Sequence, residues 1–149
     1  MNLFSIAGNP AYSQDDGLSG GDAGDDLGNA TSLPIPQTSN STRSFTGWKS
    51  ASDDPNDWYS FTVPTDYGVE VNMSSTNVTG YLVLYWESNL TLIDSSLNNN
   101  GAEYVTSDGP EVSGQDVLLR AMAITGEGFY NFTVNVFTLD TDNDGWQDT

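Results

Sequence analysis

Three carboxylates stand within five residues in Asp53-Asp54-Pro55-Asn56-Asp57, directly before a strand-like run from Trp58 to Val63. Packing like charges this closely costs free energy unless a cation neutralises them, and Ca²⁺ accepts six to eight oxygen ligands in irregular loops. Asp54 and Asp57 are expected to project from the turn and the strand start, where a second acidic segment would complete the shell. The alternative is a solvated turn, which Asp, Pro and Asn also favour.

Two further segments carry acids in a pattern that suits calcium. Residues 15–29 are rich in Gly and Asp, so they could wrap carbonyls and carboxylates round an ion, or form a flexible acidic linker. The end of the chain matches the first half of an EF-hand-type loop, but the acid at its twelfth position is missing. We therefore expect an incomplete second site or a floppy tail, with the candidate ligands Asp140, Asp142, Asp144 and Asp148.

The composition excludes several classes of function. With 21 acidic and 3 basic residues, the formal net charge is −18, which repels nucleic acid and anionic lipid. The chain has no Cys and no His, so it lacks thiol nucleophiles and the usual base for activating Ser. No apolar run approaches the ~18 residues of a membrane span. Because the acids cluster in Gly-rich turns rather than along strands lining a cleft, metal binding is favoured over glycoside hydrolysis, and no catalytic residues are predicted.

Alternating apolar residues predict an all-β chain. Tyr59, Phe61 and Val63 share one strand face, and Tyr130, Phe132, Val134 and Val136 share another. About eight short strands separated by turn residues predict an antiparallel β-sandwich, with a turn at Gly126-Glu127-Gly128. The expected strands are 43–48, 58–63, 69–73, 80–87, 90–93, 103–106, 117–124 and 129–137. Lys49, beside the acidic turn, is predicted to be a surface charge partner.

The order and spacing of four motifs resemble the bacterial and archaeal pre-peptidase C-terminal (PPC) domain family, whose relatives include the collagen-binding domains of clostridial collagenases. The motifs are Gly21-Asp22-Ala23-Gly24-Asp25, Asp53 to Phe61, Tyr81 to Tyr85, and Gly128 to Val134. The resemblance covers residues 15–138 and implies a jelly-roll-like β-sandwich that acts as a non-catalytic module. It leaves residues 1–14 as an N-terminal extension, and residues 139–149 resemble the start of a thrombospondin type 3 calcium repeat.

Carried over residue by residue, the resemblance implies that Ca²⁺ is bound by Asp22, the carbonyl of Gly24, Asp25, Asp54 and Asp57. This chain has Asp and Gly where those relatives often use Glu, which leaves a role open for Asp26 or Asp53. The implied function is a calcium-binding accessory module of a secreted or cell-surface protein, either a peptidase or a multi-module surface protein. Its role would be stabilising or targeting, and its partners would be the domains of the parent protein.

Two other functions are compatible with the sequence. Exposed aromatic side chains on a sheet can stack on sugars or on a peptide, which would make the chain an adhesion module for extracellular polysaccharide or protein. The candidates, which could equally fill the core, are Trp48, Trp58, Tyr81, Tyr85 and Trp86. Alternatively, Leu3, Phe4 and Ile6 could add a strand to a neighbouring chain. Six glycosylation sequons, which matter only in an exported chain, begin at Asn29, Asn40, Asn72, Asn77, Asn89 and Asn131.

Overall fold

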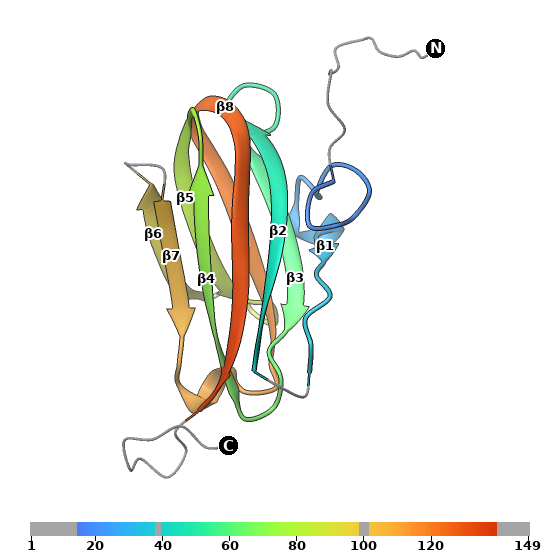
Figure 1. Cartoon of the computed structure of the whole chain (residues 1–149), viewed down its shortest axis with the longest axis vertical. Coiled ribbons are helices and arrows are strands. Elements are labelled where there is room, and N and C mark those ends of the chain that lie inside the picture. The colour runs from blue at the N-terminus through green and yellow to red at the C-terminus, as the bar shows by residue number, and fades with distance from the viewer. Residues whose placement is uncertain (1–14, 38–39, 99–101, 140–149) are drawn as a thin grey trace.

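The computed structural model describes residues 15–37, 40–98 and 102–139, which form eight strands and two short 3₁₀ helices (Figure 1). The predicted all-β class is confirmed. The elements are η1 (Leu27–Asn29), β1 (Thr31–Ser32), β2 (Ser41–Ser50), β3 (Asn56–Thr62), β4 (Tyr67–Ser75), β5 (Val78–Trp86), β6 (Leu92–Asn98), β7 (Ala102–Ser107), η2 (Pro110–Val112) and β8 (Asp116–Thr138).

Strand β8 belongs to both layers of the sandwich. Its first half pairs with β3 and β5, and its second half pairs with β2 and β4. We call β2, β4, β7 and the second half of β8 the front sheet. The back sheet contains β1, β3, β5, β6 and the first half of β8. Figure 1 shows β8 curving over one end of the molecule between the two layers.

The predicted turn at Gly126-Glu127-Gly128 is wrong, because the chain bends there without leaving the strand. Gly126 has a φ of +79°, and a Cβ on it would lie 2.1 Å from the carbonyl oxygen of Asn77. A glycine at this bend therefore lets one continuous strand pass from the back sheet to the front sheet. Two expected strands are thus halves of one.

Two smaller differences concern the edges of the back sheet. The strand expected at 90–93 instead begins at Leu92 and continues to Asn98, so the tight turn before it is longer than predicted. β1 runs parallel to β3, which makes the back sheet mixed, whereas all other strand pairs within the described ranges are antiparallel.

The core lies between the sheets and uses the predicted inward faces. Tyr59 of β3 and Tyr130 of β8 are completely buried, as is Val63 directly after β3, and Phe61 and Phe132 are almost so. The N-terminal extension and the acidic tail, with Asp140, Asp142, Asp144 and Asp148, lie outside the described residues, as do Leu3, Phe4 and Ile6. The division of the chain at residues 14 and 138 therefore stays a prediction.

Candidate metal centre

The segment of residues 15–30, which we call the N-terminal arm, crosses the side of the sandwich where β2 and β3 face each other (Figure 1). The N–H of Gly17 donates to the carbonyl of Thr46 in the front sheet, at 3.0 Å. The N–H of Trp58 in the back sheet donates to the carbonyl of Gly24, at 2.9 Å. The arm is therefore hydrogen-bonded to both layers.

The acidic turn connects the same two layers. Ser50, the last residue of β2, and Asp54 exchange two backbone hydrogen bonds of 2.9 and 3.0 Å, which closes the chain tightly before β3 begins. Asp57 comes two residues before Tyr59, so strand alternation directs its side chain to the inner face of β3. Asp54 is 7% exposed and Asp57 is 0% exposed.

The arm and the turn bring four carboxylates together. One oxygen from each of Asp16, Asp22, Asp54 and Asp57 lies within 4.8 Å of the others, and Asp22 is the exposed member of the group. Ligands on opposite sides of one Ca²⁺ ion are separated by twice the Ca–O distance, or about 4.6–5.2 Å. Four oxygens that lie within 4.8 Å of one another can therefore all belong to the shell of one Ca²⁺ ion.

Several oxygens of this group lack the hydrogen bonds that buried polar atoms normally make. Oδ2 of Asp57 accepts a hydrogen bond from the hydroxyl of Tyr130, but its Oδ1 has no hydrogen-bond partner in the described structure. Both carboxylate oxygens of Asp54 are likewise buried without a donor. Asp54 faces the carboxyl of Asp22, and the two can share a hydrogen bond only while one of them is protonated, not when both are ionised. The arrangement therefore leaves three buried oxygen atoms available to a cation.

The same geometry raises the pKa of both buried acids. Burial, followed by the charges of Asp22, Asp25 and Asp16, raises the pKa of Asp54 from 3.8 to about 7. Burial raises the pKa of Asp57 to about 9, against the opposing effect of the hydrogen bond from Tyr130. Without a cation both groups therefore keep their protons to a higher pH than an exposed acid does, because burial removes the water that would solvate the ionised carboxylate. A divalent ion at the centre would replace the protons.

The predicted ligands are partly brought together. Asp22, Asp54 and Asp57 join the group, whereas Asp25 is exposed and outside it, although its charge is close enough to act on Asp54. The carbonyl of Gly24 already accepts the N–H of Trp58. Asp26 caps η1 through the N–H of Asn29, and Asp53 is exposed outside the group.

Asp16 was missed in the sequence. It lies in an arm that contains five Asp residues in twelve positions, from Asp15 to Asp26, with no periodicity to distinguish one from another. Its burial follows from pairing with β2 next to Thr46, and its Oδ2 accepts the N–H of Ala23 at 3.4 Å. Only the contact between the arm and β2 distinguishes Asp16 from the other Asp residues, because the arm has no regular alternation of inward and outward side chains.

The prediction that Lys49 is a surface residue is wrong. Strand β2 continues through Ser50, so Lys49 falls on the inward side with Phe45 and Gly47 and is 0% exposed. Its Nζ donates to the carbonyl of Met122 at 3.4 Å and lies 5.2 Å from the centre of the Tyr130 ring. Burial lowers the pKa of Lys49, while the negative charges of Glu103 and Asp57 oppose that effect.

The aromatic candidates for ligand binding have different environments. Trp58 is buried, and its ring stacks on that of Tyr85 with 5.6 Å between their centres, while the guanidinium of Arg120 lies 5.1 Å from the centre of the Trp58 ring. Arg120 also donates through Nε to Asn56, at 2.9 Å. Trp48, Tyr85 and Trp86 are half-buried, and Tyr81 is 37% exposed on the outer face of the back sheet. These side chains do not form one open platform.

The fold and the site define a β-sandwich with a candidate cation centre at one side. No family model and no curated protein matches the chain. Among solved structures, it is similar to the pre-peptidase C-terminal domain of collagenase from Bacillus anthracis. The identity is 18%, the TM-score is 0.49, and the match covers 68% of this chain and 98% of that one. That structure is a domain of the family which the sequence motifs resemble.

The chain is also similar to PliG from Aeromonas hydrophila, a periplasmic inhibitor of g-type lysozyme. Here the identity is 8% and the TM-score is 0.44, with 71% of this chain and 94% of that one covered. Within the described ranges, no helix has the length and apolar character needed to cross a membrane.

Proposed function

We propose that this chain is a calcium-binding, non-catalytic accessory module of a secreted or cell-surface protein. The ion would be held by Asp16, Asp22, Asp54 and Asp57. The observation that carries the proposal is the set of three buried carboxylate oxygens, two on Asp54 and one on Asp57, that have no hydrogen-bond partner in the described structure. A buried carboxylate normally has a counter-ion or donors, and a hard cation supplies the missing interaction for all three at once.

Calcium is favoured over other cations by ligand type and spacing. Every side chain in the group offers oxygen, which suits a hard cation, and the chain has no Cys or His for zinc. The four oxygens lie within 4.8 Å of one another, which fits the diameter of a calcium shell, and calcium tolerates the irregular ligand geometry of an arm and a turn. Asp22 is exposed, so an ion and the water molecules that complete its shell could enter from that side.

The consequence of binding would be mechanical as well as thermodynamic. Asp16 and Asp22 belong to the arm, whereas Asp54 and Asp57 belong to the sandwich, so one ion would tie the two together. The arm is where any preceding domain of the parent protein would join, and its entry angle would be fixed by the ion. Binding to the folded state alone also raises stability with free calcium.

The accessory role and the extracellular location are proposed on sequence grounds. They rest on the order of the four motifs that resemble the pre-peptidase C-terminal family, and on the lack of Cys and His for nucleophilic catalysis. The acidic surface, at a net charge of −18, suits an exterior where dissolved salt and bound cations reduce self-repulsion. The parent would be a peptidase or a multi-module surface protein, with its other domains as partners.

Thermal unfolding in calcium, magnesium and chelator tests the proposal. A hundredfold excess of calcium over its Kd stabilises by about 2.7 kcal/mol, which corresponds to a rise in Tm of roughly 5–10 °C for a domain of this size. The Asp54→Asn variant should lose this gain, yet melt no lower than the wild type in chelator, because it removes a buried charge. Asp53→Asn, one residue away and exposed, should keep the full gain. Equal melting of the wild type in calcium and chelator would refute the proposal.

A further inference from the structure

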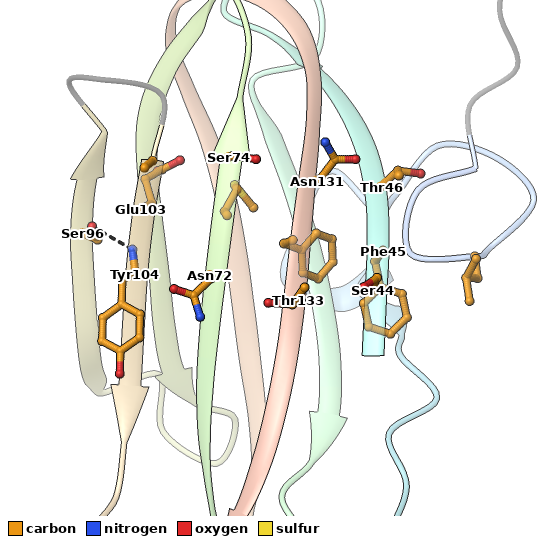
Figure 2. A pocket seen from close by; sticks show the side chains of 14 residues that line it. Ser44, Phe45, Thr46, Asn72, Ser74, Ser96, Glu103, Tyr104, Asn131 and Thr133 are labelled. Atoms are coloured by element: carbon orange, nitrogen blue, oxygen red, sulfur yellow. Dashed lines mark hydrogen bonds between the residues drawn. The ribbon is translucent and has the colours of Figure 1, made fainter. Parts of the chain in front are cut away.

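The outer face of the front sheet carries a hollow of about 770 Å³ (Figure 2). It is separate from the candidate metal centre, which lies at the start of β3 on the inner face of that strand. Three neighbouring strands contribute polar side chains to its lining, namely Ser44, Thr46, Asn72, Ser74, Asn131 and Thr133. The lining also includes the apolar residues Phe45, Met73, Ala102 and Phe132 and the acid Glu103. Tyr104 of β7 borders one side and Leu18 of the N-terminal arm borders the other, and both are exposed.

Strand register places these side chains in two rows across the sheet. Ser44 lies opposite Thr133, Thr133 opposite Asn72, and Asn72 opposite Tyr104. The second row lies two residues further along each strand and points outward on the same face. In it, Thr46 lies opposite Asn131, and Asn131 lies opposite Ser74. All are exposed except Thr133, which is half-buried. The exposed side chains of these rows are therefore hydroxyls and amides, while the apolar Phe45, Met73 and Phe132 also line the hollow.

A third row holds the border of the hollow in place. Thr42 donates to Asn135 at 2.9 Å, Asn135 donates to Glu70 at 3.0 Å, and the hydroxyl of Tyr104 donates to the other oxygen of Glu70 at 3.0 Å. Figure 2 shows the ring of Tyr104 lying broadside to the viewer, on the outer side of β7. The phenol is therefore fixed at its tip, while 44% of the residue stays exposed.

The two rows inside the hollow differ from that border. Within the described residues, no side-chain hydrogen bond is found for Asn72, Ser74, Asn131 or Thr133. Each amide can donate twice and accept through its oxygen, and each hydroxyl can do both. The array is therefore suited to a ligand that also carries closely spaced groups able to donate and accept.

Charge and backbone pairing restrict the class of ligand. The hollow has no Lys or Arg among its lining residues, and a net charge of −18 repels anionic chains. A peptide that binds by strand addition needs an unpaired strand edge, which the centre of the hollow lacks because β4 and the second half of β8 are paired on both sides. At its borders, β2 and β7 each pair with a single named strand among the described residues. Uncharged sugars meet both conditions, since they bind through ring stacking and hydroxyl hydrogen bonds.

We propose that this hollow binds a neutral polysaccharide. One sugar ring stacks on Tyr104, and the hydroxyls of that sugar and its neighbours hydrogen-bond to Asn72 and Asn131. The volume lies within the ~300–1,000 Å³ typical of small-ligand sites. This function goes beyond the calcium-binding role, and neither one depends on the other. The aromatic residue that would contact the sugar, Tyr104, was not among the candidates predicted from the sequence.

Affinity electrophoresis in native gels tests the proposal, with hydroxyethylcellulose, xylan, galactomannan and dextran as neutral probes. Alginate serves as the anionic probe and gelatin as the protein probe. Asn72 and Asn131 each begin a glycosylation sequon, so the protein is produced in bacteria and its intact mass is checked for attached sugar. Millimolar calcium is present throughout, and retardation gives a Kd for each probe.

We expect retardation by at least one neutral probe and none by alginate or gelatin. Tyr104→Ala should raise the Kd about tenfold or more, which corresponds to a stacking contribution of ~1.4 kcal/mol. Tyr104→Phe should bind within about threefold of the wild type, because it keeps the ring. Asn131→Ala should weaken binding, and Tyr81→Ala, which removes an exposed aromatic from the other sheet, should not. The proposal fails if only alginate or gelatin binds, if nothing binds, or if Tyr104→Ala binds as the wild type does.

Discussion

The hydroxyl of Tyr130 donates a hydrogen bond to Oδ2 of Asp57, joining β8 to the start of β3 across the interior of the sandwich. Because the single proton of Tyr130 is committed to Asp57, the hydroxyl of Tyr59 must donate to the oxygen of Tyr130. Both tyrosines are completely buried. The core therefore holds Asp57 through Oδ2, while its Oδ1 is buried without a hydrogen-bond partner in the described structure.

Replacing Tyr130 with Phe should destabilise the protein by about 1–3 kcal/mol, because both Asp57 and Tyr59 then lose a buried hydrogen-bond partner. Urea denaturation measures the effect. Tyr81→Phe removes a hydroxyl from an exposed tyrosine and should change stability by less than about 0.5 kcal/mol. If the two variants have the same stability, the Tyr59–Tyr130–Asp57 chain contributes nothing to folding.

Gly47 leaves room for the ring of Tyr130. A Cβ at this position would lie 2.2 Å from Cζ of Tyr130, so Gly47→Ala should displace the ring that supports Asp57 and cost about 1–3 kcal/mol. A Cβ at Gly21 meets nothing within 4 Å, so Gly21→Ala is the matched control. We expect calcium affinity to fall in the first variant and to be unchanged in the second. Equal urea midpoints and calcium affinities for the two would contradict the packing described for β2.

The stability of the calcium-free protein should fall as the pH rises. Asp54 and Asp57 have a pKa of about 7 and about 9 in the folded state, both above the ordinary value of 3.8. Between the ordinary pKa of 3.8 and these raised values, the folded protein therefore binds more protons than the unfolded one. By the linkage relation, the free energy of unfolding then decreases as the pH rises. The stabilising contribution of the two protonated acids is complete below pH 3.8 and is lost as the pH rises through their pKa values in the folded state.

Calcium should reverse this trend, since it neutralises the same carboxylates without a proton. The rise in Tm on adding calcium is expected to be larger at pH 8 than at pH 5. Asp16, Asp22 and Asp25 surround Asp54, and Tyr130 and Lys49 face Asp57, so the comparison is repeated in Asp57→Asn. That variant should show a flatter pH dependence in chelator. A calcium effect that is the same at both pH values would argue against cation binding at these acids.

Lys49 interacts with two buried acids, Glu103 and Asp57. Lys49→Met keeps most of the side-chain volume but removes the positive charge, and should destabilise by roughly 3 kcal/mol, as expected when one member of a buried ionic group is removed. Combining it with Glu103→Gln should restore part of the loss. A double-mutant cycle in urea measures the coupling, expected at about 0.5–3 kcal/mol. Additive effects would show that the two side chains act independently.

Strand alternation made most of the fold predictable. Inward faces such as Tyr59, Phe61 and Val63 follow directly from a period of two, and their burial is confirmed. The bend at Gly126 was mistaken for a turn because a glycine permits either, and only the pairing of β8 with both sheets decides between them. Lys49 was misplaced for a related reason. Its position in the alternation depends on how far β2 extends, which the polar residues after Trp48 do not reveal.

The site could be predicted only in part. Asp54 and Asp57 were identified because a dense run of acids precedes a strand, and Asp22 through the resemblance of motifs. Asp16 could not be chosen over Asp15 or Asp26, since all three lie in one irregular segment whose path is set by hydrogen bonds to β2 and β3. Tyr104 was overlooked because its exposure depends on the register of β7 at the sheet edge.

Isothermal titration of the full chain with calcium tests the central claim most directly, since Asp16, Asp22, Asp54 and Asp57 are proposed to bind one ion. Asp54→Asn/Asp57→Asn should abolish the tightest binding event, whereas Asp142→Asn/Asp144→Asn, which alters only the acidic tail, should leave it unchanged. Circular dichroism serves to check that both variants are folded. The account is contradicted if the wild type binds no calcium, or if only the tail variant loses binding.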